Sequence, residues 1–165
     1  MKRIMIMSDT HRNQVLLRKA FLDEENITHI FHLGDTYEDL DENLDLIEGI
    51  EVFKVPGLYH DGYLNRSIHH SIPATVENWK FQLVHFLNDV KKLHKNLDFV
   101  LYGHTHRPNF RELNGMYFIN PGHLKRSRDR GNDASYIIAE TETDKITFNW
   151  KKLNKEIFMT KTISR

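Results

Sequence analysis

Apolar and polar positions alternate along the chain in blocks that predict strands and helices in turn. The run over residues 3–7 stops at Ser8-Asp9 and predicts a strand buried on both faces. Helical spacing over residues 14–25 then predicts a crossover helix. The elements expected next are a strand over 27–33, a helix through Leu40, Leu44 and Ile47 that Gly49 ends, and a strand over 51–55. This β-α-β-α-β order implies parallel strands with right-handed crossovers, whose carboxyl ends lie at one edge of the sheet.

After Asp61 the pattern predicts mostly strands. A short helix is expected through Leu87, Val90, Leu93 and Leu97. The segments predicted as strands are 74–77, 79–84, 98–102, 116–119, 135–139 and 145–150. We expect the last three of these to form a run of antiparallel strands, with turns at Asn120-Pro121-Gly122 and near Thr143-Asp144.

Length, charge and the lack of cysteine limit the number of domains, the partners and the metal ligands that we expect. A chain of 165 residues predicts a single domain over 1–165, because domains commonly contain about 100–200 residues. Lys and Arg number 23, and so do Asp and Glu, so no excess of positive charge is present to hold a nucleic-acid backbone. Polymeric nucleic acid is therefore not an expected partner. The absence of cysteine excludes thiolate metal sites and leaves His, Asp, Glu and Asn as ligands.

The apolar runs are short throughout. Residues 4–7 are too few for the core of a signal peptide, and no apolar stretch approaches the roughly 20 residues that span a bilayer. We expect a soluble cytoplasmic protein with no membrane partner. Association of identical copies stays open at this point.

Side chains that bind metals follow four of the predicted strands. They occur as Asp9-Thr10-His11, Gly34-Asp35, His85 and Gly103-His104-Thr105-His106. Ligands of α/β sheets bind at the carboxyl ends of strands, so these groups are expected to converge. Carboxylates with imidazoles suit divalent Mn, Fe, Zn or Ni. Asp35 is the candidate bridge between two ions, which in dinuclear sites lie about 3.5–4 Å apart.

Each motif also has a structural interpretation. Asp9 fits a helix cap, Gly34-Asp35 fits an ordinary turn, and a lone His85 fits a hydrogen bond at a strand end. Two imidazoles around one residue, after a glycine and a buried strand, favour metal binding at His104 and His106.

In this order the motifs resemble those of the calcineurin-like metallophosphoesterases, in particular their small single-domain phosphodiesterases. The matching segments are Ser8–His11, His32–Asp35, Leu83–His85, Tyr102–Pro108 and Asn120–Gly122. The resemblance implies a four-layer α/β/β/α sandwich with two divalent metal ions at the strand ends, for which we favour Mn. It implies one ion held by Asp9, His11, Asp35 and His106, and a second held by Asp35, His85 and His104.

The third motif of the family departs from its pattern here. The family has Gly-Asn, then His or Cys, then Asp, with the Asn as a metal ligand, whereas this chain reads Pro56-Gly57-Leu58-Tyr59-His60-Asp61. Either Leu58 replaces the amide and one ligand is lost, or the loop is one residue longer and His60 or Asp61 supplies the contact. In the second version, His60-Asp61 matches the family's catalytic pair, in which the imidazole protonates the leaving oxygen. Both residues also fit an ordinary loop.

The resemblance predicts a phosphoesterase in which a metal-bound hydroxide attacks phosphorus. The substrate is expected to be a small phosphoester, and a diester in preference to a monoester. Arg128 and Arg130 follow in a basic loop and are candidates for phosphate contact, although a solvated loop explains them equally. The alternatives are a protein-binding scaffold with the same fold, or a protein that fills only the site of Asp9, His11, Asp35 and His106.

Overall fold

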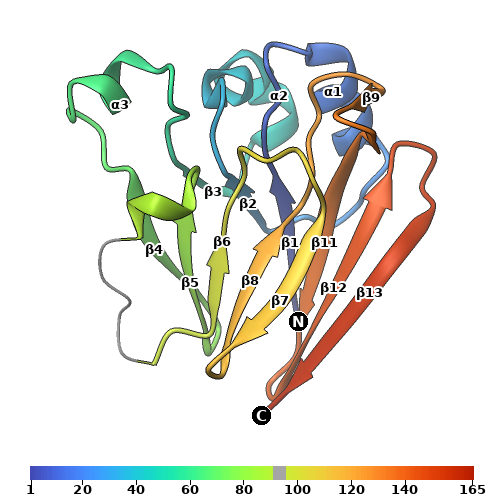
Figure 1. Ribbon diagram of the computed structural model, residues 1–165. Coiled ribbons are helices and arrows are strands. Elements are labelled where there is room, and N and C mark those ends of the chain that lie inside the picture. The colour runs from blue at the N-terminus through green and yellow to red at the C-terminus, as the bar shows by residue number, and fades with distance from the viewer. Residues whose placement is uncertain (91–95) are drawn as a thin grey trace.

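Two mixed β-sheets packed face to face make up most of the structure, a computed structural model that describes residues 1–90 and 96–165 (Figure 1). The strands are β1 (Lys2–Met7), β2 (His29–His32), β3 (Glu51–Lys54), β4 (Ser71–Val76), β5 (Trp79–Val84), β6 (Phe99–Leu101), β7 (Asn109–Leu113), β8 (Met116–Asn120), β9 (Arg128–Asp129), β10 (Asn132–Asp133), β11 (Ser135–Thr141), β12 (Lys145–Lys152) and β13 (Ile157–Ser164). The helical segments are α1 (Gln14–Leu22), the 3-10 helix η1 (Tyr37–Asn43), α2 (Leu44–Ile47), α3 (Asp61–Leu64) and the 3-10 helix η2 (Leu87–Asp89).

The first sheet contains the predicted parallel unit. Its strand order is β13-β12-β11-β1-β2-β3. β1 pairs in parallel with β2, and β2 with β3, which confirms the pairing predicted from the β-α-β-α-β pattern. Strands β11, β12 and β13 extend the sheet with antiparallel pairing. The carboxyl ends of β1 and β2 therefore lie at the same edge of the sheet, toward the top of Figure 1.

The second sheet has the order β4-β5-β6-β8-β7. β5, β6 and β8 are parallel, and β4 and β7 pair antiparallel at its two edges. The prediction that residues 116–119 join 135–139 and 145–150 in one antiparallel run was wrong, because β8 pairs with β6 and β7 while β11 and β12 pair in the first sheet. Local periodicity identifies strands but does not say which sheet accepts them.

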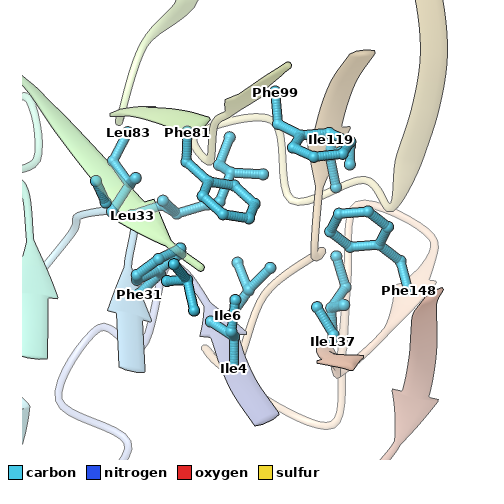
Figure 2. Close-up of a cluster of buried hydrophobic side chains, with 14 of the residues drawn as sticks. Ile4, Ile6, Phe31, Leu33, Phe81, Leu83, Phe99, Ile119, Ile137 and Phe148 are labelled. Atoms are coloured by element: carbon cyan, nitrogen blue, oxygen red, sulfur yellow. The ribbon is translucent and has the colours of Figure 1, made fainter. Parts of the chain in front are cut away.

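Apolar side chains from the facing surfaces of both sheets form a shared core (Figure 2). Ile4 and Ile6 of β1 point into it, opposite Phe81 of β5 and Phe99 of β6. The two phenylalanine rings stack with centroids 5.1 Å apart. All four side chains have no exposed surface, and each buried side chain of this size stabilises the folded state by about 1.5–3 kcal/mol relative to exposure.

The other face of the first sheet is covered by helix α1. Met5 and Met7 of β1 point to this side, where they pack with Leu17 and Phe21 of α1. The run of residues 4–7 is thus apolar at every position because β1 is buried on both faces, as predicted. With the two sheets, helix α1 forms a layered α/β sandwich.

The helix expected through Leu87 to Leu97 is described only at its start. Residues Leu87–Asp89 form the 3-10 helix η2, and Val90 follows it. The remainder of that prediction falls largely on residues 91–95, outside the described residues. Leu87, Val90 and Leu97 pack against the outer face of the second sheet. Within the described segments, none of the helices has the length and apolar character needed to cross a membrane.

Candidate metal centre

The predicted ligands lie at the carboxyl ends of strands from both sheets. Asp9 and His11 follow β1, and Asp35 follows β2. In the second sheet, His85 directly follows β5, and the segment from Gly103 to His106 follows β6. Backbone hydrogen bonds connect these strand ends, since the N–H of Asp9 donates to the carbonyl of Gly34 at 2.9 Å and the N–H of Gly103 donates to the carbonyl of His85 at 3.1 Å. The sheets thus bring residues nearly 100 positions apart in the chain to one site.

Four of these residues form one compact cluster. The candidate ligand atoms of Asp9, His11, Asp35 and His106 all lie within 4.8 Å of one another. His106 Nε2 is 3.1 Å from Asp9 Oδ1, and His11 Nε2 is 3.3 Å from Asp35 Oδ2. Asp9 and His106 are buried, with 0% and 2% of their surface exposed. The set matches the four residues that the resemblance implied for one metal ion.

Asp35 also faces a second imidazole. Its Oδ1 lies 3.4 Å from His85 Nε2, while its Oδ2 faces His11. The ring of His85 in turn lies 5.3 Å from that of His104, edge to face. The two carboxylate oxygens therefore point to two different groups of imidazoles, which is the arrangement required of a bridging ligand.

The tautomer of His85 and the unpaired atoms around it indicate that a cation fits this site. Its Nδ1 is 2.7 Å from the carbonyl oxygen of Leu33, which can only accept, so Nδ1 carries the proton and Nε2 presents a lone pair. Two acceptors, His85 Nε2 and Asp35 Oδ1, consequently face each other in a buried site. Of the six side-chain atoms that are buried without a hydrogen-bond partner in the described residues, three belong to this site: His85 Nε2, His11 Nε2 and Asp9 Oδ1. Unpaired buried acceptors are costly, and a divalent cation would satisfy all three.

Protonation states also favour metal binding. Burial lowers the pKa of His11 and of His104, which favours the neutral imidazoles that a metal requires. Burial raises the pKa of Asp9, but the adjacent imidazole of His106 lowers it by more, so the net pKa is below the usual value. Asp9 is therefore an ionised carboxylate although it is buried.

Asp129 supports His106 and was not predicted from the sequence. His106 Nδ1 donates to Asp129 Oδ2 at 2.6 Å, which leaves Nε2 directed at Asp9. Asp129 is 5% exposed, and its other oxygen accepts a hydrogen bond of 2.8 Å from Arg126 Nε. A carboxylate behind a histidine ligand fixes the tautomer and the orientation of the ring. No local sequence pattern distinguished Asp129 from its basic neighbours.

Five of the six predicted ligands adopt a left-handed backbone conformation, which non-glycine residues seldom do. The φ angles are +55° at Asp9, +47° at His11, +55° at Asp35, +65° at His104 and +59° at His106. Such positions cost about 1 kcal/mol or more each and cluster at functional sites. Each strand end thus turns sharply into the site.

Two glycines allow this close packing. A Cβ at Gly57 would lie 1.9 Å from Asp35 Oδ1, and a Cβ at Gly103 would lie 1.9 Å from Ser8 Oγ and 2.9 Å from Asp9 Oδ2. Neither position can accept a side chain without moving a carboxylate of the cluster or its neighbour. Gly57 of the altered third motif therefore has a defined role against Asp35.

His60 and Asp61 lie beside the cluster and are not part of it. Together with His11, Asp35, Glu38 and other residues, they line a cavity of about 660 Å³. His60 caps the N-terminus of α3: its Nδ1 accepts a hydrogen bond of 2.9 Å from the N–H of Gly62. The proton of the ring is therefore on Nε2, which lies 2.5 Å from Glu38 Oε1. The His60 ring also stacks on Tyr37.

The two predicted arginines are separated. Arg130 lines a cavity of about 530 Å³ together with His104, and its Nη1 donates to the carbonyls of His104 and Thr105 at 3.0 and 3.4 Å. Arg128 lines a different hollow with Asp133 and Lys152. Of these two arginines, only Arg130 lies next to a predicted metal ligand.

Comparison with known proteins identifies sequence relatives and structures with a similar fold. A phosphodiesterase of Methanocaldococcus jannaschii, MJ0936, is 30% identical over 137 residues, which cover 73% of this chain and 82% of that protein. The crystal structure of a predicted phosphoesterase from Streptococcus pneumoniae has a TM-score of 0.74 at 21% identity, and the match covers 99% of this chain and 98% of that chain. Wild-type Vps29 of Entamoeba histolytica, solved in complex with zinc, has a TM-score of 0.68 at 19% identity, with 98% of both chains covered. The family model of the calcineurin-like phosphoesterase superfamily domain matches residues 1–144, and the chain belongs to this superfamily.

Proposed function

We propose that the protein is a metal-dependent phosphodiesterase with a dinuclear site. Asp9, His11, Asp35 and His106 would hold one ion, and Asp35, His85 and His104 the other. The observation that carries the proposal is the position of Asp35, whose two oxygens lie 3.3 Å from His11 Nε2 and 3.4 Å from His85 Nε2. Two bound ions would supply polarisation of the phosphoryl oxygens and activation of water, and Mn is our first choice of metal.

The surroundings of the cluster support a diester substrate. One cavity, of about 660 Å³, contains His11 and Asp35 in its lining, and another, of about 530 Å³, contains His104. Phosphorus at the cluster would thus have space for a substituent on each side, whereas a monoester has only one. The printed name of the relative MJ0936 is also that of a phosphodiesterase.

His60 is suited to protonate the leaving oxygen. The Nε2 proton faces the cavity that contains Asp35, and Glu38 Oε1 accepts it at 2.5 Å. A general acid needs a proton within reach of the departing group, and Glu38 orients this one. A neutral ring would become an imidazolate if it lost the Nε2 proton, so in this role His60 would first take a second proton at Nδ1, which would release the N–H of Gly62, and would then donate from Nε2 as an imidazolium.

The proposal is tested by hydrolysis of bis-p-nitrophenyl phosphate. Protein stripped with a chelator should be inactive, and Mn²⁺ should restore turnover. The Asp35→Asn variant should stay inactive with Mn²⁺, whereas Asp45→Asn, which alters an exposed ion pair with Arg18, should behave like the parent protein. p-Nitrophenyl phosphate, the matching monoester, should be hydrolysed more slowly. Equal activity of parent and Asp35→Asn would remove the proposed site, and absence of hydrolysis by the parent protein in every condition would make the protein-binding scaffold the better interpretation.

A further inference from the structure

Two cavities of opposite charge flank the metal cluster. The one that contains His60 has three carboxylates in its lining, those of Glu38, Glu42 and Asp61, in addition to Asp35, and one guanidinium, that of Arg12, so its lining is negative overall. The one that contains His104 has two guanidinium groups, those of Arg107 and Arg130, and no carboxylate. A substrate that spans the cluster would therefore meet negative potential on one side and positive potential on the other.

Arg130 is held in place before any ligand arrives. Its Nη1 donates to the carbonyls of His104 and Thr105, and its Nε lies 3.8 Å from Asp129 Oδ2. A guanidinium has five N–H donors, so most remain available after these contacts. The side chain is 50% exposed, which leaves it accessible from the cavity.

Arg107 contributes a second guanidinium. It directly follows the ligand His106, and its backbone N–H donates to Thr105 Oγ1 at 3.3 Å. The other arginines of this region, Arg126, Arg128 and Arg130, lie within 4.0 Å of a carboxylate. Over residues 1–90 and 96–165, Arg107 has no such ion pair, so its charge is not neutralised by the described part of the protein.

The lining of this cavity includes another hydrogen-bond donor, the hydroxyl group of Tyr102. Asn109 Nδ2 donates to the hydroxyl oxygen of Tyr102 at 2.7 Å, so the Tyr102 proton is free to point elsewhere. Both residues line the cavity. Two guanidinium groups and a phenol thus surround a space that is large enough for a phosphate group and part of a nucleoside.

We propose that the cavity of Arg107 and Arg130 binds a second anionic group of the substrate, so that the preferred substrates are phosphodiesters that carry an additional phosphate. This inference rests on the proposed phosphodiesterase function. Arginine pairs with phosphate bidentately, which gives both affinity and orientation. The carboxylates of the opposite cavity would repel that phosphate and accept an uncharged or cationic alcohol as the leaving group.

The test compares two chromogenic diesters that differ only in the extra phosphate: the p-nitrophenyl ester of thymidine 5′-phosphate and its 3′-phosphorylated form. Charged hydrogen bonds of this kind are worth about 1.5–3 kcal/mol, so we expect kcat/KM to be about tenfold or more higher for the 3′-phosphorylated ester, mainly through a lower KM. Arg107→Ala should bring the ratio of the two values close to one. Arg128→Ala, in the separate hollow, should keep the ratio of the parent protein.

Binding of thymidine 3′,5′-bisphosphate and of thymidine 5′-phosphate, measured by calorimetry with Mn²⁺ present, separates the two proposals. Tighter binding of the bisphosphate that is lost in Arg107→Ala would support the anion site. If neither ester were hydrolysed in the same experiments, the anion site would stand and the phosphodiesterase proposal would be contradicted. The anion site would be overturned if kcat/KM were equal for both thymidine esters and both nucleotides bound equally. If bis-p-nitrophenyl phosphate were hydrolysed in that case, the phosphodiesterase proposal would stand.

Discussion

His106 Nδ1 and Asp129 Oδ2 lie 2.6 Å apart, which joins a predicted metal ligand to a buried carboxylate behind it. Asp129 lies on β9, outside both large sheets, and reaches a ligand that follows β6. Arg126 holds the second oxygen of the same carboxylate. The orientation of one predicted ligand is thus set by a short ribbon far away in the sequence.

Asp129→Asn should weaken metal binding without unfolding the protein. Loss of the negative charge makes His106 a poorer ligand, and changes behind a metal ligand typically cost about 10–100-fold in affinity. Mn²⁺ affinity at pH 8, measured by competition with a fluorescent chelator, checks this. Asp133→Asn, at an exposed position of the neighbouring β10, is the matched control and should bind Mn²⁺ like the parent protein. Unchanged affinity in Asp129→Asn would exclude a positioning role.

Metal affinity should fall as the pH is lowered, and Asp129→Asn should move this transition to lower pH. Burial lowers the pKa of His106, but Asp9 and Asp129 raise it by more, so the net pKa is above the usual value. A raised pKa keeps the imidazole protonated to higher pH, and a protonated Nε2 cannot bind metal. Removal of the Asp129 charge lowers that pKa. Mn²⁺ titrations between pH 5.5 and 8.5 on both proteins measure the two midpoints, and coincident midpoints would contradict the expected coupling.

Asp35→Asn should stabilise the metal-free protein while it abolishes activity. In the parent protein, Asp35 Oδ1 faces the lone pair of His85 Nε2, and an amide nitrogen in its place would donate to that lone pair. One buried hydrogen bond contributes about 1 kcal/mol, which corresponds to a rise in Tm of about 2–4 °C for a domain of this size. Calorimetric melting in a chelator checks the shift, and addition of Mn²⁺ should raise the Tm of the parent protein only. A lower Tm for Asp35→Asn in chelator would argue against the facing acceptors.

Gly57→Ala should displace Asp35 and thereby impair metal binding and hydrolysis. The new Cβ would be placed 1.9 Å from Asp35 Oδ1, so the carboxylate has to move. We expect at least about a tenfold loss of Mn²⁺ affinity, since a ligand is moved from its place. Gly115→Asn is the control, because no atom lies within 4 Å of a Cβ there and Asn tolerates its φ of +76°. If Gly57→Ala bound Mn²⁺ normally, the close approach would have no functional importance.

His60→Ala should slow esters with poor leaving groups more than activated ones. An alkoxide needs a proton as it departs, whereas p-nitrophenolate does not. Rates for a series of aryl and alkyl esters, plotted against the pKa of the leaving group, should show a steeper slope in the variant. Glu38→Gln, which alters the partner of His60 Nε2, should give a smaller change in the same direction. Parallel slopes for parent and His60→Ala would assign proton donation to another group.

The strand ends and their polar motifs were predictable because both depend on local sequence. An apolar run followed by Asp9 or His85 specifies a buried strand and a polar loop, and parallel pairing then specifies where the loops meet. The edge strand β13 was not predicted, since its side chains are mostly exposed and show no strict alternation. Nor was the sheet membership of β8, which depends on partners distant in the sequence.

At the site, the metal ligands were predictable from the sequence, but the backbone conformations and neighbouring residues that position them were not. The left-handed backbone at His11 or His104 follows from the tertiary structure, because isolated residues of this type favour negative φ. The contact between Asp129 and His106 spans 23 positions and depends on how β9 folds back. Likewise, Arg128 and Arg130 are two positions apart in sequence, and only the turn that follows β9 separates them into different cavities.

The predicted ligands come from both sheets, and this has a mechanical consequence. An ion held by Asp9 and Asp35 of the first sheet and by His106 of the second would act as a cross-link at one end of the sandwich, where the shared apolar core gives way to polar loops. Amide hydrogens near the upper ends of β1, β2 and β6 would then exchange more slowly with solvent when metal is bound, whereas those at the opposite ends would change little. The same residues that position the substrate would therefore also keep the two layers in register during turnover.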